Sequence, residues 1–145
     1  MFTGIIKKVG VIHSWNAKSR ILGIKSEFSS LILGESISCS GVCLTVSSFE
    51  KDIFFCNLSS ETVSKTNFKL KKEGDKLNLE KSLKIGEDLS GHLVFGHVDG
   101  ISTLNDIKND KDSWILKFSI SSELSKYLTN KCSICIDGIS LTVNK

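Results

Sequence analysis

Two short runs of this chain place thiol and hydroxyl groups after a glycine at the same spacing. Residues 41–46 are Gly-Val-Cys-Leu-Thr-Val and residues 138–143 are Gly-Ile-Ser-Leu-Thr-Val. Residues two apart on a strand share a face, so each run would present a pair of small polar groups to one side. These groups are Cys43, Thr45, Ser140 and Thr142. They could line the mouth of a small-molecule pocket in each run, or they could face solvent as ordinary strand residues.

A histidine that follows a glycine is the second candidate for chemistry. Residues 91–97 are Gly-His-Leu-Val-Phe-Gly-His, which has the glycine spacing of a phosphate-binding loop. His97 and Val98 stand where that loop needs Lys and Ser or Thr, so a nucleoside-triphosphate site is excluded. Gly96 is then either a bend in a strand or a point where the backbone approaches a ligand. His97 is either a structural histidine or part of a binding site.

The five cysteines predict reduced thiols rather than a disulfide framework, because their number is odd and no secretory signal is evident. We therefore expect a cytoplasmic protein. Cys132 and Cys135 form a C-x-x-C pair, which could be half of a zinc site or a redox pair. Residues three apart on a strand point to opposite faces, so we expect buried, inert thiols here and no metal site.

The two glycine runs belong to a longer internal match, which predicts a duplicated module. Residues 37–46 align with residues 134–143, and residues 1–6 align in the same order with residues 93–98. A polar insert at residues 109–113 absorbs the difference in spacing between the two matches.

The duplication predicts two units, at residues 1–88 and 89–145. The second unit ends before any counterpart of about residues 49–81, so its sheet cannot close and its strand edges would be unpaired. We expect the chain to be a fragment in which the second unit is only partly built.

Short apolar runs between turn residues predict strands in both units. These strands span residues 4–12, 20–25, 36–39, 44–49, 53–58 and 76–79, and then residues 95–104, 114–120, 133–136 and 140–143. Helices are expected at residues 26–33, 59–66 and 121–128. Six short strands in the first unit predict a small closed antiparallel barrel. The fold class is therefore all-β, with a small closed barrel, short helices and an incomplete second unit.

The composition is that of a folded, soluble protein with no specialised charge pattern. Apolar residues make up 40% of the chain, and the net charge of +3 is scattered, which gives no argument for nucleic acid or an anionic membrane as a partner. No apolar run approaches the roughly 18 residues of a membrane-spanning helix. The chain has no proline, so glycine, Asn, Asp and Ser must form the turns.

Five motifs resemble, in the same order, those of riboflavin synthase of the alpha-subunit type. They are Met-Phe-Thr-Gly-Ile-Ile at residues 1–6, the run at residues 41–46, Ser-Ser-Glu-Thr at residues 59–62, the glycine and histidine run at residues 91–100, and Ile-Asp-Gly-Ile-Ser-Leu-Thr-Val-Asn at residues 136–144. The resemblance covers the whole chain, but the family continues with the rest of the second barrel and a C-terminal helix.

The resemblance implies tandem six-stranded antiparallel Greek-key barrels, of which the second is incomplete in this chain. It also implies a homotrimeric transferase of riboflavin biosynthesis. Its reaction is the dismutation of two 6,7-dimethyl-8-ribityllumazine molecules into riboflavin and 5-amino-6-(ribitylamino)uracil, with no metal or redox cofactor. In this family a working site lies between the first barrel of one subunit and the second barrel of its neighbour, so that two substrates meet face to face.

The resemblance also implies two sets of substrate-binding residues. For the first barrel they are Gly4, Ile5, Ile6, Ser36, Cys43, Leu44, Thr45, Asn57, Leu58, Ser59, Ser60, Glu61 and Thr62. For the second barrel they are Gly96, His97, Val98, Lys131, Ser140, Leu141 and Thr142.

The reaction requires a base and two near-equivalent pockets, because a four-carbon unit passes between two copies of one substrate. His97 is the candidate base for removing a methyl proton. Cys43 or Ser36 could add to a ring or deliver water, and Ser140 is the counterpart of Cys43 in the second unit. We expect the 145-residue chain to have little or no dismutase activity, whereas its first barrel could still bind lumazine or riboflavin.

Two alternatives come from other classes of protein. Non-catalytic lumazine and flavin carriers share this fold and bind one fluorophore without converting it. A small structural or nucleic-acid-binding barrel is the other alternative, which the scattered charge and the unpaired aromatic residues disfavour.

Overall fold

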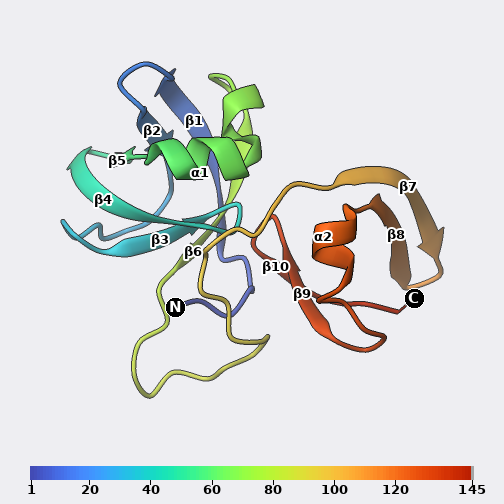
Figure 1. The fold of residues 1–145 in the computed structure, drawn as a ribbon. Coiled ribbons are helices and arrows are strands. Elements are labelled where there is room, and N and C mark those ends of the chain that lie inside the picture. Colours follow the sequence, from blue (N-terminus) through green and yellow to red (C-terminus); the bar gives the residue numbers. More distant parts are fainter. Residues whose placement is uncertain (145) are drawn as a thin grey trace.

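The computed structural model describes residues 1–144, and its main feature is a closed barrel of six antiparallel strands. The order around the barrel is β1-β2-β5-β4-β3-β6, so β6 closes it by pairing with both β1 and β3. Its strands are β1 (Lys8–Asn16), β2 (Ile21–Lys25), β3 (Ser36–Cys39), β4 (Val42–Glu50), β5 (Ile53–Asn57) and β6 (Lys76–Lys81). Figure 1 shows this barrel beside a smaller C-terminal region. The all-β class and the first barrel are confirmed.

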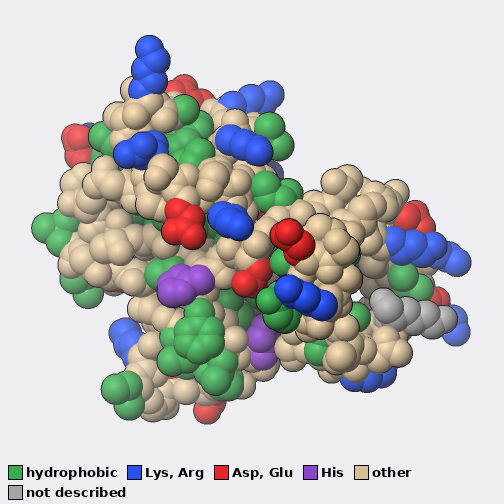
Figure 2. Space-filling model, viewed as in Figure 1, with side chains coloured by type: hydrophobic (Ala, Val, Ile, Leu, Met, Phe, Trp, Pro, Cys, Tyr) green, Lys and Arg blue, Asp and Glu red, His purple; other side chains and the backbone are tan. Residues whose placement is uncertain are grey.

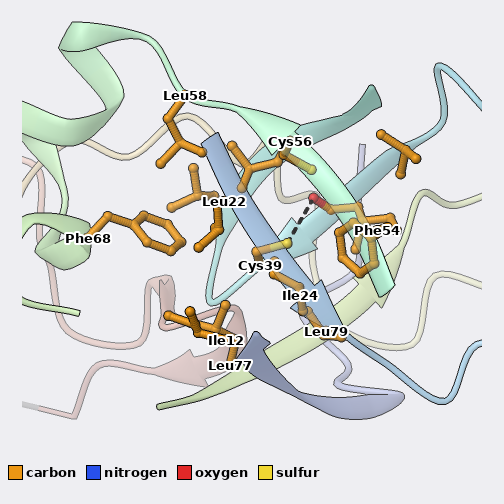
Figure 3. Packing of buried hydrophobic residues seen from close by; sticks show 14 residues of the cluster. Ile12, Leu22, Ile24, Cys39, Phe54, Cys56, Leu58, Phe68, Leu77 and Leu79 are labelled. Atoms are coloured by element: carbon orange, nitrogen blue, oxygen red, sulfur yellow. Dashed lines mark hydrogen bonds between the residues drawn. The ribbon is translucent and has the colours of Figure 1, made fainter. Parts of the chain in front are cut away.

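Alternation along the strands fills the barrel with apolar side chains. Leu22 and Ile24 of β2 are fully buried, as are Leu77 and Leu79 of β6. Figure 3 shows these side chains converging with Phe54 inside the barrel. A continuous apolar interior of this kind is the dominant favourable contribution to folding.

Two-residue turns join the strands of two hairpins. Ser40 and Gly41 between β3 and β4 both have positive φ, at 48° and 85°. Asp137 and Gly138 have nearly the same values, 47° and 84°, between β9 (Ser133–Ile136) and β10 (Ile139–Thr142). Positive φ at both central residues matches the right-handed twist of the strands, and polar-glycine pairs adopt it most readily. This is how a chain without proline makes its tightest hairpins.

The helix expected at residues 59–66 is present as α1 (Ser60–Lys65), which begins after a capping serine. The Ser59 side chain accepts a hydrogen bond from the Thr62 N–H, and Glu61 lies in the first turn. A short 3-10 helix, η1 (Asn67–Leu70), follows and buries Phe68 against the barrel. The two helices therefore cover one end of the barrel (Figure 1).

The helix expected at residues 26–33 is wrong, because this segment is an irregular loop. Lys81 donates hydrogen bonds to the Ser30 carbonyl and to the Glu35 carboxylate, and Glu35 accepts one from the Ile32 N–H. Phe28 and Leu31 pack against the core from this loop. Side chains outside the loop therefore bind backbone groups that a helix would have paired internally.

The strands expected to begin at residues 4 and 95 begin later than predicted. β1 begins at Lys8, and β7 (Thr103–Asp110) begins eight residues after the expected start. The reason is the same in both places, since residues 1–6 and 94–98 leave their own sheet and pair with the other half of the chain.

The C-terminal region, residues 89–144, contains two separate hairpins. One consists of β7 and β8 (Ser113–Ser119), and the other of β9 and β10. The expected helix at residues 121–128 is present only as the short α2 (Ser122–Ser125). In the barrel, β5 joins β2 to β4 and β6 joins β3 to β1. No strand in the described part of the C-terminal region makes either connection, so the second set of strands is incomplete, as expected.

The open hairpins leave apolar side chains exposed. Ile107 of β7 and Trp114 of β8 are more than half exposed. A fully enclosed core is therefore confined to the N-terminal barrel. Among residues 1–144, no helix has the length and hydropathy needed to cross a membrane.

Because the enclosed core lies in the barrel, we expect Leu79→Ala to destabilise the protein strongly. Leu79 is 0% exposed, whereas Leu70 of η1 is 75% exposed and serves as the matched control. Leu79→Ala should lower the free energy of unfolding by about 2–5 kcal/mol, and Leu70→Ala should change it by less than about 0.5 kcal/mol. Urea unfolding followed by tryptophan fluorescence measures both. Equal losses in the two variants would contradict the assignment of the core.

Candidate functional site

Two crossing segments join the halves of the molecule. Residues 1–6, the N-terminal segment, meet residues 94–98, the second crossing segment, at an antiparallel bridge between Phe2 and Val94. The Phe2 N–H donates to the Val94 carbonyl at 2.7 Å, and the Val94 N–H donates to the Phe2 carbonyl at 3.0 Å. Both side chains are buried. Each segment then continues onto a strand of the opposite half.

The two crossings are reciprocal. The Cys43 N–H of β4 donates to the Gly96 carbonyl at 2.8 Å, and the Ser140 N–H of β10 donates to the Gly4 carbonyl at 2.8 Å. The hairpin turns also meet, since a Cβ added to Gly41 would lie 2.9 Å from the Gly138 nitrogen. Each crossing therefore places backbone from one half directly over a candidate side chain of the other.

Only glycine fits at the two crossings. Gly96 has φ +80°, and a Cβ there would lie 2.6 Å from the Cys43 Cβ. Gly4 has φ +77°, and a Cβ there would lie 2.7 Å from the Ser140 Cβ. Positive φ and close backbone approach are the two conditions that require glycine. Of the two interpretations left open for Gly96, a strand bend and a close approach, the structure shows a close approach to Cys43.

A cavity lies where the second crossing segment meets the N-terminal barrel and α1. Its volume is about 350 Å³. The lining residues come from β4, from α1 and its end, and from the second crossing segment: Val42, Cys43, Glu61, Thr62, Lys65, Thr66, Gly96, His97 and Val98. Both halves of the chain are therefore needed to form this cavity, which we call the composite cavity.

The composite cavity combines charged, hydroxyl and apolar groups. Glu61 and Lys65 lie on α1, His97 is exposed at the second crossing segment, and Val98 packs against the barrel core. Figure 2 shows histidine side chains on the surface between the two parts of the molecule, next to a group of apolar side chains. The arrangement can hold a flat ring on its apolar side and polar substituents towards α1.

A second polar cluster lies at the other crossing. His92 Nδ1 and Ser140 Oγ are 2.7 Å apart, and both residues are half-buried. The His92 N–H donates to the Thr3 carbonyl at 3.0 Å. The N-terminal segment thus lies against this His92–Ser140 pair in the same way that the second crossing segment lies against Cys43.

The predicted division of site residues between the two barrels is wrong for the crossing segments. Gly4 lies against Ser140, not Cys43, and Gly96 lies against Cys43, not Ser140. His97 and Val98 line the cavity of the first barrel. The prediction assigned each glycine to the half in which it occurs in the sequence, whereas the chain exchanges the two segments between halves.

Several other predicted residues lie near the composite cavity without lining it. Ser36 is the strand partner of Thr45, which is exposed and shares the outward face of Cys43. Leu44 and Leu58 are buried in the core, and Asn57, Ser59 and Ser60 lie between the end of β5 and the first turn of α1. Ile5 and Ile6 follow Gly4 at the opposite crossing, where Ile6 lies near Gly138. Ser59 contributes by capping α1.

The remaining predicted residues of the second unit lie on β10 and at the start of the β9–β10 hairpin. Leu141 is half-buried and Thr142 exposed on β10. Lys131 donates to the Asn144 side-chain oxygen at 3.1 Å. Ser140 lies against Gly4, and its hydroxyl meets His92, which was not among the predicted residues.

Sequence reasoning missed Val42, Lys65 and Thr66 of the composite cavity, and it missed two polar residues at the opposite crossing. Lys65 and Thr66 line the composite cavity from α1 and its C-terminal end, and their spacing from Glu61 on one helix could have suggested this. His92 was part of a quoted motif but received no role. The buried carboxylate of Glu80 had no sequence signal at all.

Burial makes three of the five thiols poor nucleophiles. It raises the pKa of Cys39 well above the ordinary 9.0 and the pKa of Cys56 to about 12. Burial also raises the pKa of Cys135, and the Glu80 charge adds to the effect. Cys43 is therefore the cysteine that combines partial exposure with a place in the cavity. No group of three or more His, Cys, Asp or Glu side chains within residues 1–144 is arranged to hold a metal ion.

The sequence matches the lumazine-binding domain at residues 3–82 and again at residues 95–145. The chain is also 38% identical to riboflavin synthase of Photobacterium leiognathi over 149 residues, which cover 99% of this chain and 68% of that protein. The chain belongs to the riboflavin synthase family. It is 38% identical to the riboflavin synthase of Brucella abortus, covering 76% of that protein, and 35% identical to that of Bacillus subtilis, covering 68%.

Solved structures share the fold of this riboflavin synthase family member. LumP complexed with riboflavin superposes with a TM-score of 0.87 at 23% identity, covering all of this chain and 81% of that one. LumP complexed with 6,7-dimethyl-8-(1'-D-ribityl) lumazine gives a TM-score of 0.84 at 21% identity, with 80% of that chain covered. At this identity the likeness extends to the fold alone.

The glycine at the crossing should be more sensitive to substitution than a glycine with the same backbone angle in open space. Gly34 has φ +81°, and a Cβ there would meet nothing within 4 Å, so it is the matched control for Gly96. Gly34→Ala should lower the free energy of unfolding by the left-handed backbone strain alone, about 1–2 kcal/mol. Gly96→Ala should lose more, because the second crossing segment must also move away from Cys43. Urea unfolding of both variants measures the difference, and equal losses would show that the crossing is not closely packed.

Proposed function

We propose that the composite cavity binds the ring system of 6,7-dimethyl-8-ribityllumazine or of riboflavin. The observation that carries this proposal is the lining itself, with Cys43 and Thr62 on one side and His97 and Val98 on the other. A volume of about 350 Å³ falls within the range of small-molecule pockets, about 300–1,000 Å³. The names of the relatives and the ligands of the LumP structures support this class of ligand.

The lining groups suit a flat heteroaromatic ring that carries a polyhydroxylated chain. Val42 and Val98 offer apolar surface for the ring. The hydroxyls of Thr62 and Thr66 and the ammonium of Lys65 offer hydrogen-bonding groups for ring oxygens, ring nitrogens or ribityl hydroxyls. Apolar walls with a few fixed polar groups are the usual composition of a specific ligand site.

We further propose that the activity of the family, dismutation of two ribityllumazine molecules into riboflavin and 5-amino-6-(ribitylamino)uracil, uses this cavity for one of the two substrates. His97 is the candidate base for a methyl proton and Cys43 the candidate nucleophile, because both line the cavity. Ser36 lies farther along the same face as Cys43 and could deliver water.

The second substrate would use the opposite crossing. We propose that residues 1–88 and 89–145 are duplicated lumazine-binding units, and that Ser140 takes in the second unit the place that Cys43 takes in the first. The residue aligned with His97 is Ile5, so His92, whose ring meets Ser140, is a further polar candidate of the second unit without a counterpart in the first. Leu141, Thr142 and Lys131 are further candidates in that unit. The reciprocal contacts of Gly4 and Gly96 support this correspondence.

Catalysis also requires that two bound rings face each other, and we propose that a neighbouring chain supplies the second ring, as in a homotrimer. Leu93 and Phe95 are 54% and 63% exposed beside the second crossing segment, an apolar surface that a neighbour could cover. A cytoplasmic location is part of the same proposal and rests on the reduced cysteines.

A non-catalytic lumazine or flavin carrier is the second candidate, and one observation favours it. The composite cavity is walled by α1, which follows β5 in the barrel. The described C-terminal region has no counterpart of β5, and therefore no helix that could wall a cavity in the way that α1 does. The composite cavity alone would be sufficient for binding a fluorophore.

Riboflavin titration followed by quenching of its fluorescence tests the binding site. We expect one riboflavin per chain. His97→Gln and Cys43→Ser should each weaken binding about fivefold, the effect of one lost polar contact of about 1 kcal/mol. His13→Gln is the matched control, because His13 is exposed on β1 and does not line the cavity. Unchanged affinity in both cavity variants would contradict the proposed site.

Incubation with 6,7-dimethyl-8-ribityllumazine separates the two candidates. Steady-state formation of riboflavin, lost in Cys43→Ser and kept in Cys132→Ser, would establish catalysis through this cavity. Tight binding without riboflavin formation would establish the carrier. Failure to bind either compound would overturn both.

A further inference from the structure

Glu80 is a buried carboxylate that the proposed function does not use. It lies on β6 and is 3% exposed. Its Oε1 accepts hydrogen bonds from the Thr3 N–H and the Thr3 hydroxyl, both at 2.7 Å, and its Oε2 accepts one from the Gly4 N–H at 3.0 Å. All three donors belong to the N-terminal segment, so this side chain fixes that segment to the barrel.

The Glu80 carboxyl group is held by hydrogen-bond donors of the N-terminal segment. No ion pair to Glu80 is found among residues 1–144. A buried charge is costly unless hydrogen bonds satisfy it, and every group that contacts these two oxygens is a donor. Ser38, its partner on β3, leaves a buried hydroxyl without a hydrogen-bond partner in the described chain. The carboxylate therefore depends on Thr3 and Gly4.

The bonds to Glu80 continue directly into the second polar cluster. The Thr3 carbonyl accepts from the His92 N–H at 3.0 Å, and the Gly4 carbonyl accepts from the Ser140 N–H at 2.8 Å. One face of these two residues thus binds Glu80, and the other binds the backbone of His92 and Ser140. The side chains of His92 and Ser140 meet at 2.7 Å on the far side of the segment.

Among residues 1–144, no carboxylate holds the second crossing segment as Glu80 holds the N-terminal segment. Thr3 aligns with Phe95, whose side chain is 63% exposed and offers no donor. Its neighbour Gly96 is held by the single backbone bond from Cys43. The two crossings are therefore alike in backbone contacts but differ in that only the N-terminal segment is tied to a carboxylate.

We propose that Glu80 is the positioning residue for the His92–Ser140 pair, acting through Thr3 and Gly4. The role of that pair in binding a second ring rests on the proposed function, but the coupling itself is a property of the free protein. Glu80 lies on the N-terminal barrel and the pair lies in the C-terminal region. The carboxylate therefore sets the geometry of a site to which it does not belong.

Glu80→Gln tests the coupling, because it keeps the shape of the side chain and replaces one acceptor oxygen with a donor group. In the full 145-residue chain, without ligand, amide hydrogen exchange at His92 and Ser140 should become about tenfold faster or more, as expected when bonds to a charged group are lost. The Leu22 amide on β2 should keep its rate. Glu35→Gln is the matched control, since the Glu35 carboxylate pairs with Lys81 and Ile32 and not with this segment.

The ¹⁵N chemical shifts of the histidine ring give a readout that general destabilisation would not move. Loss of the bond between His92 Nδ1 and Ser140 Oγ should shift the His92 ring signals in Glu80→Gln, while the His13 signals stay in place. Unchanged His92 shifts and unchanged Ser140 exchange would overturn the proposal.

Thr3→Val keeps the proposal testable if Glu80→Gln does not fold. It removes the Thr3 hydroxyl, one of the three donors to Glu80, and keeps the two backbone donors. It should produce the same changes at His92 and Ser140, but smaller ones. When Glu80→Gln and Thr3→Val are combined, their effects on amide exchange should be less than additive, because both changes remove the same interaction. Additive effects would overturn the coupling.

The test of Glu80 and the test of ligand binding can give different results. Faster Ser140 exchange in a protein that fails to bind riboflavin would support the role of Glu80 and overturn the proposed function. Riboflavin binding together with unchanged Ser140 exchange would support the proposed function and overturn the role of Glu80.

Discussion

The account depends on one constraint, the close passage of a glycine backbone over a strand of the opposite half of the chain. Gly96 lies against Cys43 and Gly4 against Ser140, at distances that leave no room for a Cβ. A side chain at either place would separate the two halves. Because the passage is a contact between backbones, it fixes the relative position of the halves more rigidly than contact between flexible side chains would. The contact between Gly96 and Cys43 places residues 96–98 against the barrel, and the composite cavity forms there.

This constraint also explains why the two halves differ in completeness yet remain one structure. The N-terminal barrel encloses its core with six strands, whereas the C-terminal region has two open hairpins in the described chain. The paired segments at Phe2 and Val94, the bond between Gly4 and Ser140, and the Glu80 carboxylate tie the C-terminal region to the barrel. A stable barrel thus supports residues that do not form a closed core of their own. The polar groups proposed to do chemistry lie along this junction rather than inside either half.

The sequence was sufficient to predict the first barrel. It was insufficient to predict that the two crossing segments each contact the opposite half of the chain. Alternating apolar residues on short runs located all six strands, and Ser59 with Glu61 correctly indicated the start of α1. The helix expected at residues 26–33 failed because Lys81 and Glu35, distant in sequence or outside the run, bind its backbone groups. Periodicity carries no information on which half a glycine will contact, so Gly4 and Gly96 were assigned to the wrong pockets. Glu80 could not be found from the sequence, because a carboxylate at the end of a strand is usually exposed and its partners are about eighty residues away.

The measurement that tests the central claim most directly is a set of nuclear Overhauser contacts between bound riboflavin and the protein. The ring methyl protons should contact Thr62 or Cys43 from the barrel and Val98 from the second crossing segment within one and the same complex. Contacts to residues of both segments would establish that the site is built from two halves of the chain. Contacts confined to the barrel, with none to residues 96–98, would show that the crossing plays no part in recognition and would contradict the account.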